Sequence, residues 1–430
     1  MDRLYSAVLW GCAAVALPYF AVRSATTSRY RAGWRQRPGF GLPGAPPRRR
    51  ARCIWFHAVS VGEVRAVLPL LRAARARYAE ARLVLSTVTE AGQQVAAREA
   101  TDLDALIYFP FDFVRCIRRH LAALRPQLVV LTETELWPNF LRVCRAEGVP
   151  VMLANGRLSP RSFARYRRCG WFVRRMVRRL SACAMQSPED LARIVALGAP
   201  AERCRMAGNM KFEASADAAP ARRQALRAAW GLAEATPLLL AGSTHPGEEE
   251  QLLEAFARVR RAHPAACLLL APRHVERAAE VAELARARGF AVRRRGELGE
   301  APVLLLETMG ELKELYAMAD LAYIGGSLVP HGGQNPLEAA ACGVGILCGP
   351  HTFNFAAICE RLRRGEAAWR VADAAELAAA WTLLLDDPPR RSAMGSRARQ
   401  IIAENQGAVE RHLEIIAALL EGPGGRAASA

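Results

Sequence analysis

The feature that most constrains the fold of this chain is a regular alternation of short apolar segments with longer amphipathic ones. Short apolar runs bounded by turn residues are typical of buried strands, and the segments between them have the apolar spacing of helices. Such alternation predicts a parallel sheet with helices on both faces. The pattern fills most of the 430 residues and restarts after residue 211. We therefore predict an α/β protein with two doubly wound, Rossmann-like domains facing a cleft.

The predicted strands follow the apolar runs. In the first series they are 53–58, 82–86, 106–109, 128–131, 149–154 and 182–186. In the second series they are 237–241, 266–270, 302–306, 321–324 and 344–348. The predicted division of the chain is a membrane-anchor helix over 1–22, a basic linker over 23–52, an N-terminal domain over 53–211, a C-terminal domain over 212–421 and a disordered tail over 422–430.

Near the start of the chain, Leu4–Val22 contains no charged residue. A helix of this length covers roughly 30 Å, the thickness of the hydrocarbon core of a bilayer. We predict a signal anchor that spans the membrane. A helix lying at the interface is the alternative, because Pro18 weakens a continuous span. Arginines follow the segment and no acid lies between it and Glu63, so the positive-inside rule places the rest of the chain in the cytoplasm.

The charge balance favours an acidic partner. The chain has 59 lysines and arginines against 41 aspartates and glutamates, a formal net charge of +18, and its only lysines are Lys211 and Lys313. The partner could be nucleic acid, an anionic lipid or a phosphorylated substrate. The eleven cysteines show neither Cys-x-x-Cys pairs nor the His and Cys spacing of a zinc site. The sequence therefore predicts reduced thiols, without a disulfide framework or a metal.

One stretch concentrates the positive charge. Residues 155–180 contain nine arginines and no acid, interleaved with Phe163, Tyr166, Trp171 and Phe172. A run of charge usually forms a solvated face. Arginines mixed with aromatic rings also suit an anionic membrane surface or a phosphorylated lipid headgroup. RNA is the competing partner, although no nucleic-acid-binding motif accompanies the stretch.

Carboxylates follow two predicted strands of the first domain. Glu63 follows the first strand, and Glu133 and Glu135 follow the fourth. Parallel strands end at one shared edge of the sheet, and open α/β folds bind ligands there. The structural alternative is a capping box, in which Glu63 folds back on Ser60, and a helix cap for one of the other two. A helix N-terminus lowers the pKa of a carboxyl group, whereas burial and a neighbouring carboxylate raise it.

A glycine-rich loop in the second domain has the features of a phosphate site. After the predicted strand 321–324 it contains Gly325, Gly326, Gly332 and Gly333. Asn335 is the expected N-cap of the next helix, Pro336 its first residue, and Glu338 is placed to bind ribose hydroxyls. Bare backbone N–H groups at a helix N-terminus bind phosphate well. The alternative is an ordinary glycine-rich turn between a strand and a helix.

Three further features bear on an anionic ligand. Gly242–His245 forms a second possible phosphate cradle after its strand. Arg273, after the next strand, would clamp a monophosphate, or else lie exposed at a helix entry. Lys211 lies at the predicted domain boundary and is expected at the mouth of the cleft. Neither the Gly-x-Gly-x-x-Gly fingerprint nor a P-loop occurs, which disfavours NAD enzymes and P-loop ATPases.

Taken together, eight motifs in order along the chain resemble those of the bacterial Kdo transferases, where Kdo is 3-deoxy-D-manno-octulosonic acid. The motifs are SVGEV (60–64), TETELWPN (132–139), NGRLSPRSF (155–163), GNMKF (208–212), GSTHPGEE (242–249), APRH (271–274), TMGEL (308–312) and GGSLVPHGGQNPLE (325–338). The chain departs from the family pattern at Ala339, where proline is expected, and at Gln334, where histidine is common.

The resemblance implies a membrane-associated, inverting glycosyltransferase of the GT-B fold that needs no metal or other cofactor. Its donor would be CMP-Kdo and its acceptor the tetraacylated lipid A precursor, in lipopolysaccharide synthesis at the cytoplasmic face of the inner membrane. An anionic membrane surface is therefore an expected partner, and nucleic acid is not. The alternatives are another lipid-linked GT-B glycosyltransferase that uses a UDP-sugar, and a basic scaffold that binds RNA or membranes without catalysis.

The resemblance also implies roles for single residues. By motif, Glu63 matches the family's general base, and Glu133 and Lys211 match residues that stabilise the transition state. The residues that match CMP contacts are Pro272, Arg273, Met309, Gly310, Glu311, Asn335, Pro336, Leu337 and Glu338.

Overall fold

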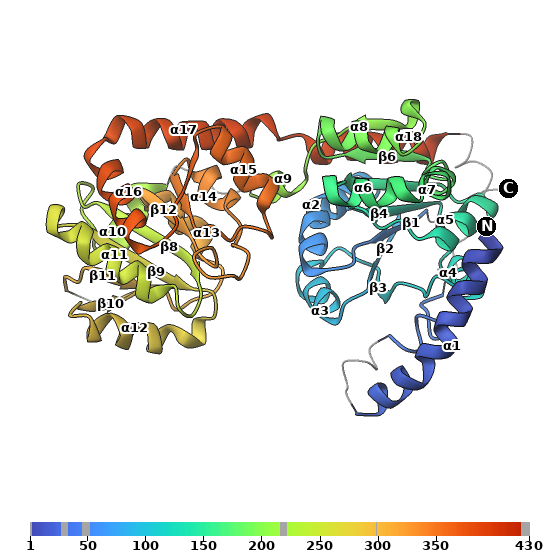
Figure 1. The fold of residues 1–430 in the computed structure, drawn as a ribbon, viewed down its shortest axis with the longest axis horizontal. Coiled ribbons are helices and arrows are strands. Elements are labelled where there is room, and N and C mark those ends of the chain that lie inside the picture. The colour runs from blue at the N-terminus through green and yellow to red at the C-terminus, as the bar shows by residue number, and fades with distance from the viewer. Residues whose placement is uncertain (1, 27–32, 45–51, 216–221, 298, 423–430) are drawn as a thin grey trace. The chain divides into compact units, whose positions relative to one another are not determined.

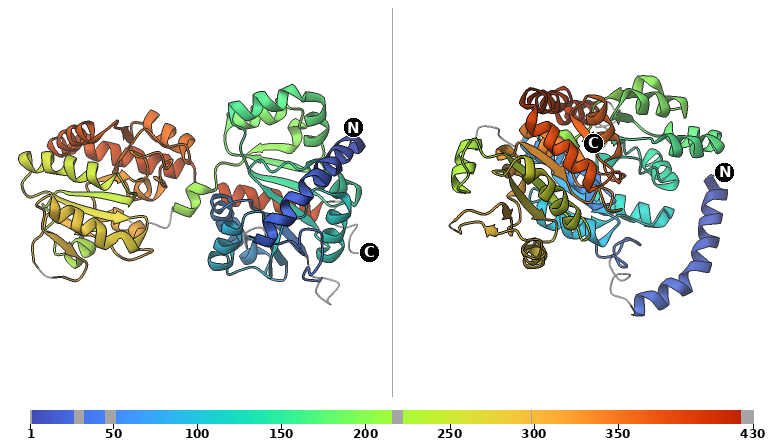
Figure 2. Two further views of the ribbon diagram at one scale, coloured as in Figure 1. Left: turned by 60° about the horizontal axis from the view of Figure 1, so that its bottom comes forward. Right: turned by 60° about the vertical axis from the view of Figure 1, so that its left-hand side comes forward.

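The chain folds into two units. The computed structural model describes residues 2–26, 33–44, 52–215, 222–297 and 299–422 (Figure 1). The first unit consists of Met1–Ala214 together with Gln406–Ala430, and the second of Ser215–Asn405. Each unit has one parallel sheet with helices on both of its faces, as the views from two further directions show (Figure 2). The predicted pair of doubly wound α/β domains is confirmed.

The first unit alternates strands and helices almost throughout. Its strands are β1 (Cys53–His57), β2 (Arg82–Thr87), β3 (Ala105–Tyr108), β4 (Leu128–Thr132), β5 (Val151–Gly156), β6 (Ala182–Met185) and β7 (Cys204–Met206). Its helices are α1 (Asp2–Thr26), α2 (Val61–Arg77), α3 (Glu90–Glu99), α4 (Val114–Leu124), α5 (Pro138–Ala146), α6 (Pro160–Arg168), α7 (Gly170–Val177), α8 (Pro188–Ala196), α9 (Lys211–Ser215) and α18 (Ala408–Glu421).

The first sheet has the strand order β3-β2-β1-β4-β5-β6-β7, with every neighbouring pair parallel. The chain moves outward from β1 to β3, then returns to the other side of β1 and moves outward again. The order therefore reverses between β1 and β4, where the connections leave in opposite directions. Such a reversal leaves a crevice outside the carboxyl ends of the two strands, and open α/β sheets bind ligands there.

Two apolar cores cover the faces of this sheet. Strand residues alternate between them, so Ile54 and Phe56 point to one face while Trp55 points to the other. The first core includes α2 and α18, and the second includes α4, α5, α7 and α8. Because both faces are covered, the strand sequences are continuously apolar, which is why they were recognisable.

The second unit repeats this architecture. Its strands are β8 (Leu238–Thr244), β9 (Cys267–Pro272), β10 (Val292–Arg294), β11 (Val303–Leu305), β12 (Leu321–Ile324), β13 (Gly345–Cys348) and β14 (Ala368–Arg370). Its helices are α10 (Arg223–Ala229), α11 (Glu249–Ala262), α12 (Ala278–Ala287), α13 (Leu312–Leu315), α14 (Leu337–Cys342), α15 (Ala356–Arg364), α16 (Ala374–Asp386) and α17 (Pro388–Glu404). The strand order β10-β11-β9-β8-β12-β13-β14 reverses between β8 and β12.

The last helix of the chain packs on the first unit. α18 packs against α2, and Ile416 is buried in the core to which both helices contribute. His412 accepts a hydrogen bond from the N–H of Asn155 at 2.9 Å and contacts the carbonyl of Ala408 through Nδ1 at 2.6 Å. This differs from the prediction, which ended the second domain at residue 421. The apolar face of α18 packs into an apolar core of the first unit, so the chain returns to that unit.

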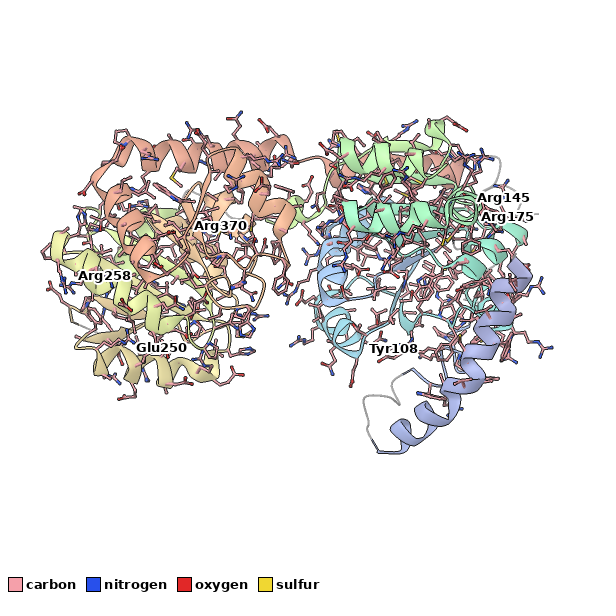
Figure 3. The ribbon with its side chains drawn as sticks, in the orientation of Figure 1. Tyr108, Arg145, Arg175, Glu250, Arg258 and Arg370 are labelled. Atoms are coloured by element: carbon pink, nitrogen blue, oxygen red, sulfur yellow. The ribbon has the colours of Figure 1, made fainter. Side chains whose placement is uncertain are left out.

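Residues 33–44, predicted as part of a basic linker, also pack on the first unit. Gln36 Oε1 accepts a hydrogen bond at 3.0 Å from the N–H of Tyr108, which is labelled in Figure 3. Arg82 donates to the carbonyl of Pro43 at 3.2 Å. Parts of the predicted linker and tail lie outside the described residues, namely 27–32, 45–51 and 423–430.

The N-terminal helix α1 docks on the same unit. The hydroxyl of Tyr5 donates to Asp112 Oδ2 at 2.9 Å, and that of Ser6 donates to Asn139 Oδ1 at 3.0 Å. Within the residues that the structure describes, no helix combines the length and the apolar character needed to cross a membrane. The predicted membrane-spanning signal anchor is therefore not supported.

We predict that His412→Ala weakens the first unit. The substitution leaves the N–H of Asn155 without its acceptor inside the core and opens a cavity, so the free energy of unfolding should fall by about 2–3 kcal/mol. Hydrogen exchange, read separately for the amides of the first unit, measures this. Glu414→Ala, an exposed position on the same helix, is the control and should change little.

The same histidine gives a pH dependence with a definite sign. Burial lowers the pKa of His412 from 6.5 to about 4. The unfolded chain therefore takes up this proton first, and the stability that neutral His412 contributes is lost as the pH falls from about 6.5 toward 4. His412→Ala should lack this part of the acid sensitivity. Equal exchange rates in both variants at neutral pH would contradict the assigned role of His412.

Candidate active site

Glu63 lies at the reversal point of the first sheet. It occupies the first turn of α2, directly after β1. Its Oε2 accepts a hydrogen bond from the N–H of Val59 at 2.9 Å, and its Oε1 accepts one from the hydroxyl of Ser60 at 3.1 Å. Ser60 is the N-cap residue but its side chain caps no helix N–H. The carboxylate thus folds back on the helix start, without the reciprocal bond of a full capping box.

The surroundings raise the pKa of Glu63 from 4.5 to about 7. Burial is the largest cause, and the negative charges of Glu133 and Glu135 add to it, while the bonds from Val59 and Ser60 lower the pKa. Burial therefore outweighs the favourable groups at the helix start. At neutral pH such a carboxyl group exists in both protonation states, which suits a general base.

Glu133 follows β4, the neighbour of β1 at the reversal point. Its φ of 61° lies in the left-handed region, which costs a non-glycine residue roughly 1–2 kcal/mol. Its Oε1 accepts a hydrogen bond from Lys211 Nζ at 3.0 Å, and both side chains are about four-fifths buried. The charge of Lys211 offsets that of Glu133, and the ion pair fixes the carboxylate in place. The structure thus brings Glu63, Glu133 and Lys211 to one edge of one sheet.

The segment carrying Lys211 is held by a buried asparagine. Asn155, at the end of β5, accepts a hydrogen bond at Oδ1 from the N–H of Met210 at 3.0 Å. Gln186 donates to its carbonyl at 2.9 Å, and its own N–H donates to His412. Two hydrogen bonds in series therefore connect the C-terminal helix to the residue next to Lys211. This support comes from far along the chain and had no local sequence signal.

In the second unit, a carboxylate occupies the amides of the glycine-rich loop. Glu248 is fully buried just before α11. Its Oε1 accepts hydrogen bonds from the N–H groups of Ser327 and Leu328, each at 2.9 Å, and from the hydroxyl of Tyr323 at 2.6 Å. Its Oε2 accepts one from the N–H of Gly326 at 2.7 Å. These three N–H groups of the loop are therefore not available to phosphate, because Glu248 already takes them.

Close approach explains one glycine of this loop. A Cβ on Gly325 would lie 2.2 Å from the carbonyl oxygen of Ser243, a distance that no real side chain tolerates. Gly325 therefore lets the end of β12 meet the end of β8, which are paired strands. The two loops at the reversal point are joined by backbone contact as well as by Glu248.

The helix after this loop begins slightly later than expected. α14 starts at Leu337, and Pro336 occupies the N-cap position. Asn335 still serves the helix start, because its Oδ1 accepts the N–H of Leu337 at 3.1 Å. Glu338 lies in the first turn, as predicted. Gly343 ends the helix with a φ of 70°.

The other predicted nucleotide residues lie at the same edge of the second sheet. Pro272 ends β9, and the N–H of Arg273 donates to the carbonyl of Thr244 at 2.9 Å, joining the ends of β9 and β8. Residues 309–311 follow β11, with Met309 70% exposed. Since β9, β11 and β12 run parallel, their following loops share one edge, and the loop after β12 carries the remaining predicted contacts.

Three histidines gather beside this edge. The sequence placed His245 in a possible phosphate cradle and gave no role to His274 and His331. The ring of His245 stacks on that of His331, with centroids 4.3 Å apart and planes inclined by 18°. His274 lies edge-on at 6.2 Å, and Gln334 Nε2 lies 3.0 Å from His245 Nε2. Among the described residues, no group of three or more His, Cys, Asp or Glu side chains is placed to hold a metal ion.

One signal in the sequence could have drawn attention to these residues. His245 follows β8 and His331 follows β12, so each lies in a loop after a strand of the reversal point. Glu248 had no comparable signal. Glu248, Glu249 and Glu250 are equally compatible with acids of the first helical turn. Only the fold shows that Glu248 and Glu249 are buried and that Glu248 binds the loop amides.

Comparison with known proteins places the chain among glycosyltransferases. Residues 32–214 match the family described as 3-deoxy-D-manno-octulosonic-acid transferase (kdotransferase), and residues 248–401 match glycosyl transferases group 1. The 3-deoxy-D-manno-octulosonic acid transferase of Haemophilus influenzae is 34% identical over 425 residues, covering 97% of this chain and 98% of that protein. The enzyme of the same name from Bordetella pertussis is 37% identical over 393 residues, covering 88% and 90%.

Solved structures with low identity share the fold. The UDP-GlcNAc 2-epimerase of Neisseria meningitidis bound to UDP-GlcNAc gives a TM-score of 0.58 at 11% identity, covering 85% of this chain and 99% of that one. A glycosyltransferase of Rickettsia africae gives 0.56 at 13% identity, covering 87% and 100%. These likenesses show the arrangement of two Rossmann-like domains and nothing finer.

We predict that Glu133→Gln lowers the pKa of Glu63. The substitution removes a repelling charge and frees Lys211 to attract, and both effects favour the ionised form of Glu63. Carbon-13 NMR of labelled glutamate carboxyl groups, assigned with Glu63→Gln, gives the titration midpoint. Glu99→Gln is the control, because Glu99 pairs with Arg65 on the surface of the same unit. A midpoint for wild-type Glu63 near 4.5 would contradict the described burial of this carboxyl group.

Proposed function

Because the chain belongs to the family of 3-deoxy-D-manno-octulosonic acid (Kdo) transferases, we propose that it transfers Kdo from CMP-Kdo to the tetraacylated lipid A precursor, with Glu63 as general base. The chain is a glycosyltransferase, and Kdo is the sugar that it transfers. Our proposal concerns the finer details of this reaction, namely the donor nucleotide, the acceptor and the role of Glu63. The observation that carries the role of Glu63 is the burial of this carboxyl group, which raises its pKa to about 7, at the reversal point of the first sheet.

In the proposed reaction, ionised Glu63 takes the proton of the acceptor's primary hydroxyl group. The oxygen attacks the anomeric carbon of Kdo as the bond from that carbon to the phosphate oxygen breaks. CMP leaves with the electron pair of that bond, and the configuration inverts because attack and departure occur on opposite sides. The negative charge of Glu133 stabilises the positive charge that develops on the sugar, and the positive charge of Lys211 favours the negative charge that develops on the departing phosphate.

We assign donor binding to the second unit. A nucleoside monophosphate needs a cation for its phosphate and acceptors for its ribose hydroxyls. Arg273, half-buried at the end of β9, supplies the first, and Glu338 in the first turn of α14 supplies the second. Pro272, residues 309–311 and Asn335–Leu337 complete the proposed contacts. Because they lie on the loops of one sheet edge, a single nucleotide can reach them together.

We assign membrane contact to the first unit, at the cytoplasmic face of the inner membrane. In α1, the side chains of Leu4, Val8, Trp10 and Val15 are each more than half exposed, which is unusual for large apolar groups on one helix. Exposed arginines are spread over α5, α6 and α7, including the labelled Arg145 and Arg175 (Figure 3). An apolar helix beside basic helices suits an anionic bilayer surface, where each arginine adds about 1 kcal/mol of attraction.

A sugar activated by UDP is the alternative to CMP-Kdo as the donor. The observation that favours it is the shared fold with an epimerase bound to UDP-GlcNAc. Turnover measured side by side with CMP-Kdo and UDP-sugars in lipid micelles separates the two. Transfer from a UDP-sugar alone would exclude the proposed donor.

We predict that Glu63→Gln and Glu63→Ala each lower the transfer rate by at least about 100-fold, because the acceptor hydroxyl loses its base. Binding of CMP and the folded state should stay nearly intact, since Glu63 belongs to the other unit. The wild-type rate constant kcat should rise with pH through about 7, where Glu63 ionises. Glu90→Gln, a surface carboxylate at the start of α3, is the matched control. Normal turnover in both Glu63 variants would exclude the assigned base.

We predict that the double substitution Val8→Glu and Val15→Glu weakens binding to vesicles containing phosphatidylglycerol. Two carboxylates on the exposed face of α1 remove apolar contact and repel anionic headgroups. Co-flotation with vesicles measures the bound fraction, and pure phosphatidylcholine vesicles should bind less protein. Leu383→Glu is the control, because Leu383 is an exposed apolar residue of the second unit. Unchanged flotation in the double variant would contradict the role of α1.

A further inference from the structure

The loops at the reversal point of the second sheet have little left to offer an anion. Glu248 takes the N–H groups of Gly326, Ser327 and Leu328, as described above. The N–H of Gly325 donates to the carbonyl of Gly242, and that of Gln334 donates to the carbonyl of Gly325. Phosphate beside residues 325–328 therefore depends on side chains, although glycine-rich loops usually bind it through backbone amides.

The stacked histidine pair lies on the two loops of that reversal point. His245 follows β8 and is only 8% exposed, whereas His331 of the loop after β12 is exposed. Gly326 makes room for the buried ring, because a Cβ there would lie 3.1 Å from Cδ2 of His245. The two rings therefore lie where the loop after β8 contacts the loop after β12. Nε2 of His245 faces the side-chain amide of Gln334.

The charges around His245 determine its protonation. Burial, first, and then the positive charges of His331, His274, Arg273 and Arg277 lower the pKa of His245 from 6.5 to about 4. The nearby carboxylates are committed elsewhere. Glu248 holds the glycine-rich loop, and Glu249 pairs with Arg277 at 2.9 Å. In the absence of an anion, His245 is therefore neutral at pH 7. Its neighbours oppose protonation of the ring because they would repel the positive charge.

A bound anion reverses this balance. A phosphate beside His245 supplies the negative charge that the site lacks, and an opposite charge within hydrogen-bond distance raises the pKa of an imidazole. Neutral His245 accepts at Nε2 from the amide N–H of Gln334, whereas the protonated ring must donate there. A half-turn of the Gln334 amide exchanges its donor for its carbonyl acceptor, so that one residue serves both states of the ring.

Resting on the proposed function, we propose that His245 binds the phosphate of the nucleotide donor, takes up one proton from solvent as the donor binds, and is held in both protonation states by Gln334. His245 is the ligand-contacting group in this proposal, and Gln334 and His331 are positioning residues. Donor binding then favours low pH, while the base Glu63 needs high pH. The Michaelis constant KM for the donor should therefore rise with pH over the range in which kcat also rises.

The test uses the methyl ester of CMP, a phosphodiester whose phosphate does not titrate between pH 6 and 8. Calorimetry of the full chain in buffers of different ionisation enthalpy gives the number of protons taken up. We expect net uptake at pH 7 and a dissociation constant that rises with pH by up to about tenfold per unit. His245→Gln should bind without uptake and with little pH dependence. His331→Gln, which removes a repelling neighbour, should shift the pH dependence to higher pH.

Two further variants make the test specific. Gln334→Met can neither donate nor accept, so it should lower the affinity at both ends of the pH range while leaving the fold intact. His263→Gln is the matched control, because His263 lies at the end of α11 beside Asp386 and outside the cluster. Circular dichroism confirms folding of each variant.

The outcomes separate this inference from the proposed function. Binding of the ester without proton uptake, and with the same pH dependence in wild type and His245→Gln, would overturn the role of His245 while donor binding stands. Absence of binding for the ester, together with absence of transfer from CMP-Kdo in the same preparation, would overturn both. Proton uptake that His245→Gln abolishes and His263→Gln retains supports the inference.

Discussion

The reversal of strand order in each sheet is the constraint on which the rest of the structure depends. A parallel strand must be followed by a crossover, so every connection to a ligand-binding loop leaves from one edge of the sheet. Where the order reverses, two such loops diverge and leave room between them. Glu63 and Glu133 follow the two central strands of the first sheet, and His245 and His331 follow those of the second. Residues far apart in the chain thus become neighbours for one topological reason.

Two buried carboxylates show how their surroundings decide what a glutamate does. Glu248 accepts hydrogen bonds from the N–H groups of His245, Gly326, Ser327 and Leu328 and from the hydroxyl of Tyr323, so both of its oxygens are used in holding the glycine-rich loop. Glu63 accepts only two hydrogen bonds and faces the charges of Glu133 and Glu135. A carboxyl group whose oxygens are occupied by several donors serves to hold the backbone, whereas one with few donors and like-charged neighbours, such as Glu63, can exchange a proton near neutral pH.

Most of the fold could be predicted because both faces of each sheet are covered, which makes the inner strands continuously apolar. The strands that escaped prediction, β7, β10 and β14, have three residues each and lie at sheet edges. Too short for a pattern, they form because a neighbouring strand offers hydrogen bonds. The site was predictable where acids and arginines follow strands, as at Glu63 and Arg273. The site was not predictable where the hydrogen-bonding partner is distant in the sequence, as for Glu248 and the loop after β12.

The sequence by itself determined the α/β class, the two series of strands and helices, and the motifs that carry the family resemblance, since all of these are written in local patterns. Only the tertiary structure decided that α18 returns to the first unit, that Lys211 pairs with Glu133, and that burial outweighs the helix start in raising the pKa of Glu63. These outcomes depend on which surfaces and charges meet in space. Such contacts cannot be predicted from local sequence patterns, because tertiary packing determines which distant residues touch.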